Sequence, residues 1–420
     1  MTVTTPEPSA VRVELEPHHA EIVTATLPLI GANIDEITKE FYRRLFSNHP
    51  ALWRNLFNRG NQAQGSQQRA LAASIATFAT HLVDPALPHP AELLSRIGHK
   101  HASLGVTADL YPVVHENLFA AIVEVLGAET VTAEVAEAWD RVYWIMADTL
   151  IELENGLYSD AGVEPGDVFR RLRVVSRVDD PSGAVLVTVR ADAPVNFLPG
   201  QYVSVGVTLP DGARQLRQYS LVNDAGTTDL TFAVKPVDVT SAQPAGEVST
   251  WIRANLCVGD LLDVTVPFGD LHVSAHARSN NMSGAEGKAL VLISAGIGIT
   301  PMIGILEHLA AERPDTHVRV LHADRSDITH PLRERQHELV EALPNASLDV
   351  WYEDGVTAGT PGARPGLLNL AGIELPVDAE IYLCGGAGFV AAVRTQLSER
   401  GIGLERVHCE LFAPNDWLLD

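Results

Sequence analysis

Cysteine and positive charge are both scarce in this sequence of 420 residues. The three cysteines, Cys257, Cys384 and Cys409, are odd in number and far apart, so they predict neither a disulfide framework nor a CxxC metal pair. Lysine and arginine number 30 against 53 aspartate and glutamate residues, which gives a formal net charge of −23. Because so acidic a chain is repelled by phosphate backbones and anionic surfaces, we expect no nucleic-acid partner.

Long apolar runs are also missing. No uncharged apolar stretch approaches the length that spans a bilayer. The N-terminal MTVTTPEPSAVRVELEP has no basic start followed by an apolar run, as a secretory signal has. We therefore expect a cytoplasmic protein without stable membrane insertion. The chain does contain 46% hydrophobic and 20% charged residues, which is a globular composition, and its length predicts roughly two to four domains.

The hydrophobic pattern changes its period twice along the chain. The first part has helical periodicity, with an expected break at Pro28 and an end at Pro50, and favours an all-α domain. The second has six short strands of period two, which favour an antiparallel six-stranded β-barrel. The third alternates strands and helices, which predicts an α/β domain with a parallel sheet. The expected segments are a flexible extension (1–16), the helical domain (17–160), the barrel (165–272), a flexible loop (273–288) and the α/β domain (289–420).

The segment IGHKHASLGV, residues 97–106, holds two histidines on opposite sides of a predicted helix. His101 continues the apolar stripe that includes Ile97, whereas His99 lies about half a turn round and is expected to face water. Taken alone, the segment leaves two readings of His101 open. It could be a buried histidine that hydrogen-bonds within its domain, which is the commoner case, or a metal or haem ligand.

The segment ISAGIGITPM follows a predicted strand and opens a predicted helix. Glycines let the backbone approach a pyrophosphate, Thr300 is expected to cap the helix, and Pro301 suits its first position. An ordinary tight turn is the alternative, but the complete strand–turn–helix context favours a dinucleotide site. The expected NAD(P) contacts are Gly296, Ile297, Gly298, Ile299, Thr300 and Pro301.

The motif RQYS, with PGQY before it and GEVSTWI after it, resembles the flavin barrels of the ferredoxin–NADP reductase family. Alone, RQYS could be any exposed strand with one arginine. The resemblance implies that Arg217 pairs with the FAD pyrophosphate, that Tyr219 packs on the isoalloxazine, and that Ser220 hydrogen-bonds near its reactive nitrogen. CGG resembles the nicotinamide-side motif, and CELFAP resembles the tail that places an aromatic residue against the flavin. The implied contacts are Tyr202, Arg217, Gln218, Tyr219, Ser220, Gly246, Glu247, Val248, Ser249, Glu410, Leu411, Phe412, Ala413 and Pro414 for FAD, and Cys384 and Gly385 for NAD(P).

The helical segment resembles a globin, and with the reductase part it resembles a flavohaemoglobin over nearly the whole chain. The resemblance makes His101 the proximal ligand of a haem b iron and Tyr42 the distal tyrosine. It makes Phe57 the residue that wedges the haem, and it puts Gln67 and Leu71 on the distal side. Each of these also has a plain reading as a core or surface residue, but their joint order favours haem.

Two further residues match the proximal partners of the nitric-oxide-detoxifying flavohaemoglobins. Tyr111 and Glu154 would hydrogen-bond with the proximal histidine and make it more electron-donating, as in peroxidases. The resemblance therefore implies that NAD(P)H reduces FAD, FAD reduces haem, and the haem uses O2 to convert nitric oxide to nitrate. Lys100 and Glu410 would lie between the haem edge and the flavin and serve interdomain electron transfer.

Several alternatives remain open at this stage. The chain could be an oxygen or nitric oxide sensor, a peroxide-reducing flavohaemoprotein, or a flavin reductase with a purely structural helical domain. We expect a monomer with small-molecule substrates. Asp324 and Arg325 fall at the end of the second strand of the predicted parallel sheet, and with both present the sequence does not choose between NADH and NADPH.

Overall fold

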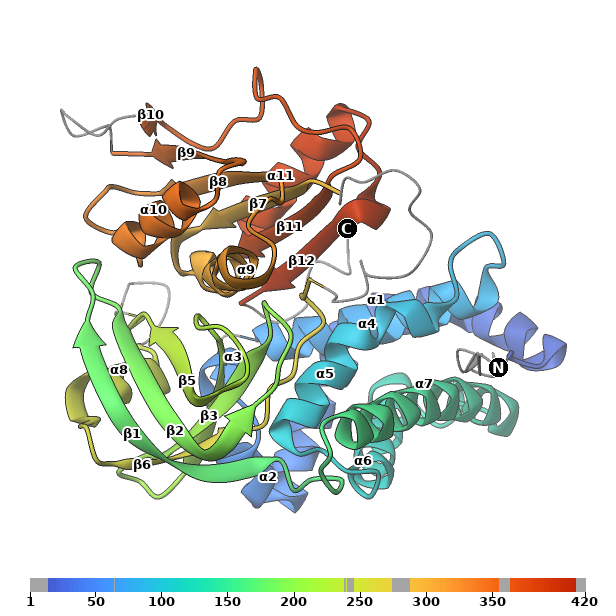
Figure 1. Cartoon of the computed structure of the whole chain (residues 1–420). Helices are drawn as coiled ribbons and strands as arrows, with labels where there is room; N and C mark the ends of the chain where they lie inside the picture. The colour runs from blue at the N-terminus through green and yellow to red at the C-terminus, as the bar shows by residue number, and fades with distance from the viewer. Residues whose placement is uncertain are drawn as a thin grey trace, which may run out of the picture.

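A computed structural model of the chain describes residues 14–63, 65–237, 239, 245–273, 288–354 and 363–412. Most of the predicted N-terminal extension and of the 273–288 loop, and both Ala413 and Pro414, lie outside these described residues. The chain forms a helical domain, then a curved antiparallel sheet, then a parallel sheet with helices, as the pattern predicts (Figure 1).

The helical domain packs around the long first helix, α1. Its buried side chains, among them Val23, Ile37, Phe41 and Leu45, contact α4, α6 and α7 in one apolar core. None of the described helices combines the length and the apolarity needed to cross a bilayer. The elements are α1 (Pro17–Asn48), α2 (Pro50–Asn55), α3 (Arg59–Ala63), α4 (Ser66–Val83), the 3₁₀ helix η1 (Pro90–Leu93), α5 (Ser95–Leu104), α6 (Leu110–Leu126) and α7 (Ala133–Asp160).

The expected break at Pro28 is wrong, because α1 runs through this residue without interruption. A proline inside a helix costs about 3 kcal/mol, since it removes one backbone hydrogen bond and crowds the preceding turn. Val23 and Ile30 are buried on either side of Pro28. Each fully buried aliphatic side chain contributes roughly 1.5–3 kcal/mol, so packing of the continuous stripe offsets the local penalty. The helix ends at Asn48, before Pro50, as predicted.

The second domain is a curved six-stranded antiparallel sheet in the order β4-β3-β6-β1-β2-β5. Its outer strands approach each other at an isolated bridge between Leu221 and Phe232, which gives the sheet its half-barrel form. Alternate residues of the strands fill the interior with valine, leucine and phenylalanine. The elements are β1 (Phe169–Asp179), β2 (Val185–Val195), β3 (Tyr202–Thr208), β4 (Arg214–Ser220), β5 (Thr227–Val234), α8 (Glu247–Asn255) and β6 (Leu261–Thr265).

The third domain is a six-stranded parallel sheet in the order β10-β9-β8-β7-β11-β12. The strand order reverses between β7 and β11, and the crevice beyond the carboxyl ends of such strands is where α/β sheets bind ligands. The elements are β7 (Leu290–Ala295), the 3₁₀ helix η3 (Gly296–Gly298), α9 (Ile299–Glu312), β8 (Val318–Asp324), α10 (Arg333–Ala342), β9 (Ala346–Tyr352), β10 (Ala363–Pro365), β11 (Glu380–Gly385), α11 (Ala387–Glu399), the 3₁₀ helix η4 (Leu404–Arg406) and β12 (Val407–Leu411).

The three domains meet around α5. This helix contacts β3 of the half-barrel, and Arg96 near its start donates from Nη2 to the carbonyl oxygen of Leu411 at the end of β12, 2.8 Å away. Figure 1 shows α5 between the half-barrel and the other helices, with the parallel sheet above both. On the other side, α9 packs so closely on the half-barrel that a Cβ on Gly304 would lie 2.4 Å from the Leu221 carbonyl oxygen.

Candidate functional site

The predicted proximal residues form one hydrogen-bonded group between α5, α6 and α7. His101 Nδ1 lies 2.9 Å from Glu154 Oε1 and 3.2 Å from the Tyr111 hydroxyl. Tyr111 donates to the same carboxylate oxygen over 2.5 Å. Because an ionised carboxylate only accepts hydrogen bonds, the imidazole proton belongs on Nδ1 and the lone pair of Nε2 is left for a metal.

Burial distinguishes the two partners of His101. Glu154 is 2% exposed, and a buried carboxylate is tolerated when it is hydrogen-bonded, as it is here by two donors. Burial raises the pKa of Tyr111, and the Glu154 charge raises it further, so the phenol keeps its proton and donates. The resulting pair holds the His101 ring in one tautomer and one orientation.

The predicted distal residues also come together. The Tyr42 hydroxyl, on α1, lies near the side chains of Gln62 and Gln67. Burial raises its pKa, and the two amides oppose this rise. Its ring meets the Phe57 ring edge-on, with centroids 5.8 Å apart. Leu71 follows Gln67 by one turn of α4 and packs against the same core. Gln62 is an addition that the sequence did not signal.

Apolar surface on the helices that carry these two groups is not fully covered. Among the described residues, α4 and α5 make hardly any contact with each other, although both pack on other helices. Apolar side chains on them, such as Ile75 and Ile97, are only partly buried, and the His101 side chain is 33% exposed. An unpaired imidazole nitrogen beside apolar helices fits a haem, whose iron takes a histidine and whose ring is apolar.

His99 does not face water, contrary to expectation. Its Nδ1 accepts a hydrogen bond from the backbone N–H of Gly269, 3.0 Å away, in the turn after β6. Burial lowers the pKa of His99 against the raising effect of Asp270, which keeps the ring neutral and able to accept. The face of α5 that points away from the helical core is covered by the second domain, and periodicity within one domain does not predict such a contact.

The predicted flavin residues line the β3–β4 pair of the half-barrel. Tyr202 lies opposite Ser220 in the strand register, and the Tyr219 ring stacks on Phe232 with centroids 5.5 Å apart. The Ser220 hydroxyl is buried and has no hydrogen-bond partner among the described residues. Buried polar groups are normally satisfied, so this hydroxyl fits a site for a ligand that accepts or donates there. Gln218 donates from Nε2 to the Ser204 hydroxyl at 3.0 Å.

Helix α8 starts beside this strand pair. Gly246 precedes its first residue, Glu247, and a Cβ at Gly246 would lie 2.6 Å from Ser249 Oγ, so a side chain here would displace that hydroxyl. The backbone N–H groups of such a first turn, here including that of Val248, favour a phosphate. Burial lowers the pKa of Arg217, and the negative charge of Glu247 is among the opposing effects, so the guanidinium is near this helix start.

The two predicted NAD(P) motifs touch each other. Gly296 has a φ of 54° and opens η3, and a Cβ on Gly298 would lie 2.5 Å from the carbonyl oxygen of Cys384. The expected cap is wrong: Thr300 is the second residue of α9, and its hydroxyl donates to the Ile297 carbonyl at 3.0 Å. The 3₁₀ turn starts the helix earlier than the sequence suggests, so Pro301 is its third residue rather than its first.

The end of β12 brings Glu410 beside the NAD(P) motif, because Cys384 and Glu410 are register partners. Burial raises the pKa of Glu410 against the effect of Arg96, whose Nη2 lies 3.0 Å from Glu410 Oε1. Burial lowers the pKa of Lys100 to about 8, and Arg96 contributes while Glu410 opposes. The predicted pair of Lys100 and Glu410 therefore shares one junction, with Arg96 as an addition. Phe412 is 46% exposed.

Asp324 is the last residue of β8 and Arg325 follows it, at the strand end where the sequence predicts them. Asp324 is buried, and its Oδ1 accepts hydrogen bonds from the Arg325 backbone N–H at 2.7 Å and from the Thr329 hydroxyl at 2.5 Å. Arg325 is exposed.

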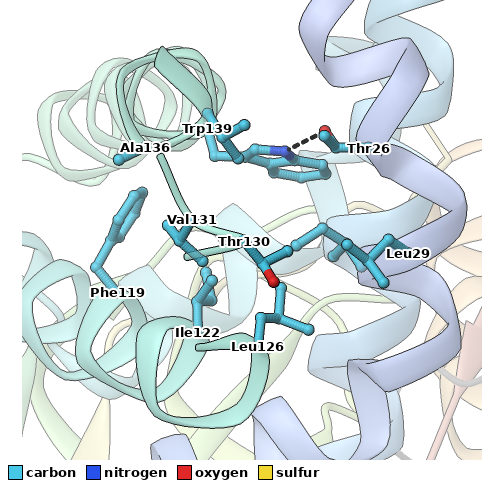
Figure 2. Close-up of a pocket in the computed structure, with 11 residues that line it drawn as sticks. Thr26, Leu29, Phe119, Ile122, Leu126, Thr130, Val131, Ala136 and Trp139 are labelled. Atoms are coloured by element: carbon cyan, nitrogen blue, oxygen red, sulfur yellow. Dashed lines mark hydrogen bonds between the residues drawn. The ribbon is translucent and has the colours of Figure 1, made fainter. Parts of the chain in front are cut away.

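A separate apolar pocket lies between α1, α6 and α7 (Figure 2). Its volume is about 20 Å³, and Leu29, Ile122 and Trp139 are among the residues that line it. The indole N–H of Trp139 donates to the Thr26 hydroxyl at 2.9 Å. None of the predicted site residues lines it, so it is distinct from the groups around His101 and Tyr42.

Comparison with known proteins adds family relationships to this geometry. Residues 39–150 match the globin family, and residues 292–395 match the oxidoreductase NAD-binding domain. A flavohemoprotein of Bordetella parapertussis is 36% identical, over 95% of this chain and 98% of that protein. The crystal structure of a flavohemoglobin from Malassezia yamatoensis with bound FAD and heme has a TM-score of 0.84 and 33% identity, over 96% of this chain and 100% of that one. The FAD/NAD-binding domain of a Vibrio cholerae nitric oxide dioxygenase has a TM-score of 0.52 and 30% identity, over 59% of this chain and 100% of that one.

Proposed function

Because this chain belongs to the flavohemoprotein family, we propose that it is a nitric oxide dioxygenase, an oxidoreductase that uses NAD(P)H and O2 to convert nitric oxide to nitrate. Its cofactors are haem b, FAD and NAD(P)H, in line with the FAD and heme of the Malassezia relative. Haem supplies the iron that binds O2, and FAD divides a hydride into single electrons for it. The substrates are nitric oxide and O2, and the enzyme acts as a cytoplasmic monomer without nucleic-acid partners.

The hydrogen-bonded group of His101, Glu154 and Tyr111 carries this proposal. His101 Nε2 is the iron ligand, because Nδ1 is committed to Glu154 at 2.9 Å. The buried carboxylate gives the imidazole partial imidazolate character, and such a ligand donates electron density to the iron. This favours a protein that activates O2 over one that only stores it. The same group argues against a structural helical domain, which has no need of a carboxylate–tyrosine pair on one histidine.

On the distal side, the Tyr42 hydroxyl would be the hydrogen-bond donor to O2. Burial keeps the phenol protonated, so it has a proton to donate. Gln67 and Gln62 hold the hydroxyl in place, and Phe57 and Leu71 keep the surroundings apolar, which strengthens the hydrogen bond.

The reductase residues bind and align the two nucleotides. Arg217 and the first turn of α8, Gly246–Ser249, would hold the FAD pyrophosphate. Tyr202, Tyr219 and Ser220 would contact the flavin ring, together with Gln218 and residues 410–412. The Gly296–Pro301 turn and Cys384–Gly385 would bind NAD(P)H, since their contact at Gly298 puts both motifs together at the carboxyl ends of the neighbouring strands β7 and β11. Lys100 and Glu410 lie where the α5 helix of His101 meets β12, and they align haem and flavin for electron transfer.

The proposal is tested by following nitric oxide with an electrode in aerated buffer with NADH or NADPH. The purified protein should show a Soret band and should remove nitric oxide only while reduced nucleotide and O2 are both present. His101→Ala is the matched control, because it should keep FAD and lose the haem-dependent consumption. Reduction of FAD with no consumption of nitric oxide by the wild-type protein would refute the proposal.

A further inference from the structure

The segment that carries Phe57 is held by the flavin-binding strand of another domain. Gln215, on β4, is 1% exposed, and its Nε2 donates to the carbonyl oxygens of Arg54 at 3.0 Å and Phe57 at 3.3 Å. Its Oε1 accepts a hydrogen bond from the Arg59 backbone N–H at 3.4 Å. The amide of one buried side chain therefore satisfies three backbone groups between α2 and α3. This polar side chain points out of the half-barrel, where strand side chains usually meet water, and it is buried against the helical domain.

The two residues that follow Phe57 in the chain also contact β4 and α8, the proposed flavin-binding elements. Asn58 Oδ1 accepts a hydrogen bond from Arg217 Nη2 at 2.9 Å, and Arg59 Nη2 lies 2.7 Å from Glu247 Oε1 at the start of α8. The segment is thus tied to β4 and α8 as well as to its own helix α2, where the Phe57 backbone N–H donates to the Leu52 carbonyl at 3.0 Å.

The other side of Phe57 faces the distal group. Its ring centroid is 5.8 Å from that of Tyr42 and 5.2 Å from that of Phe46, edge-on in both cases. A packed aromatic cluster has few alternative arrangements. A shift of the Phe57 backbone is therefore passed to the Tyr42 ring and to the direction of its hydroxyl.

We propose that Gln215 is a positioning residue, which fixes Phe57, and through it Tyr42, relative to the flavin-binding strand. It thereby makes the distal haem pocket depend on the docking of the reductase. This inference rests on the proposed function, because it requires a haem ligand beneath Tyr42. The ion pairs of Arg59 belong to the same interface, but their acidic partners are more exposed and water screens them. Gln215 acts through buried bonds, whose loss leaves carbonyl groups without partners.

The alternative is that Gln215 only holds the domains together. Arg54→Met separates the two, because Arg54 Nη2 donates to the Asp211 carbonyl at 2.9 Å across the same interface. This substitution removes an interdomain hydrogen bond but keeps the Arg54 carbonyl that Gln215 uses.

The experiment compares the full-length holoprotein with Gln215→Leu, Gln215→Glu and Arg54→Met. The C–O stretching band of carbon monoxide on the ferrous protein reports the polarity and geometry around Tyr42. Stopped-flow O2 dissociation reports the strength of the distal hydrogen bond. FAD content and NADH-driven reduction of ferricyanide report the reductase alone.

In Gln215→Leu the C–O band should shift or split and O2 should leave several-fold faster, with FAD content and ferricyanide reduction unchanged. Gln215→Glu keeps the shape and loses the donor, so it should move both signals in the same direction. Arg54→Met should leave both at the wild-type values.

Wild-type bands and O2 dissociation in both Gln215 variants would overturn the inference. Equal changes of the C–O band and of O2 dissociation in Arg54→Met would also overturn it, because any loosening of the interface would then suffice. Loss of FAD in both Gln215 variants would overturn it as well. A wild-type protein without a Soret band would instead overturn the proposed function, and this inference with it.

Discussion

Replacement of Tyr42 by phenylalanine removes one hydroxyl from the distal group and leaves its packing intact. The Tyr42 ring lies among Phe41, Phe46 and Phe57, with centroids 4.8, 5.5 and 5.8 Å away, and a phenylalanine ring fills the same space. A hydrogen bond to a partly charged acceptor contributes about 1.5–3 kcal/mol. Since each 1.4 kcal/mol is a factor of about ten, we expect O2 to dissociate roughly ten- to a hundredfold faster.

Two glutamines beside the Tyr42 hydroxyl affect the expected size of the change in O2 dissociation. Gln62 and Gln67 both lie near the Tyr42 hydroxyl, and either amide can turn to donate to O2 once the hydroxyl is gone. This compensation places the expected effect toward the lower end of the range. Replacing Gln67 with leucine in the same variant should then speed O2 dissociation further.

The assay is stopped-flow displacement of O2 by carbon monoxide from the ferrous protein. Tyr158→Phe is the matched control, because the Tyr158 hydroxyl is also buried but donates to the Val106 carbonyl at 2.6 Å, away from the distal group. Haem content, FAD content and flavin reduction should stay at wild-type levels in both variants. An O2 dissociation rate in Tyr42→Phe equal to that of Tyr158→Phe would place Tyr42 outside the ligand pocket.

Three further predictions concern other parts of the molecule. His101→Ala should lose the Soret band and retain the flavin absorbance, because the iron loses its ligand while the reductase is untouched; a full Soret band would show that another residue binds the iron. Glu410→Gln should leave hydride transfer to FAD near its wild-type rate and slow the reduction of haem, which stopped-flow spectra separate as flavin bleaching and the Soret shift; unchanged rates for both steps would make Glu410 a structural residue. Acid should destabilise the α/β domain, because burial lowers the pKa of His322 to about 3 and also lowers that of its stacked neighbour His330. Both rings bind a proton only on unfolding, so the free energy of unfolding is greatest above the ordinary histidine pKa of about 6.5. Below that pH it should fall by roughly 1.4 kcal/mol per pH unit for each histidine. Equal urea midpoints of unfolding at pH 7 and pH 5 would contradict this.

The architecture was predictable because each domain has its own hydrophobic period. The change from helical spacing to alternation, and then to alternating strands and helices, follows from which face of each element is buried in its own domain. The NAD(P) motifs were predictable for a similar reason, since glycines at a strand end are required where backbones approach within about van der Waals distance. Gly298 against the Cys384 carbonyl is such a contact.

The sequence did not predict contacts between domains or the detail of the backbone at a helix start. His99, Arg96 and Gln215 all bond to residues more than 150 positions away, as with His99 and Gly269. No local pattern distinguishes such residues from solvated ones. The prediction that Thr300 caps α9 was wrong because a 3₁₀ turn of three residues precedes this helix.

The central claim is that both oxygen atoms of one O2 molecule are transferred to one nitric oxide. Addition of O2 to nitric oxide to give nitrate takes up one electron, and NADH supplies two, so about two nitric oxide molecules should be consumed for each NADH. The direct measurement is mass spectrometry of the nitrate formed by the purified protein from nitric oxide, NADH and ¹⁸O2. The account predicts nitrate that carries two labelled oxygen atoms, in a yield that matches the nitric oxide consumed. Nitrate with one labelled atom, or nitrous oxide as the main product, would contradict it.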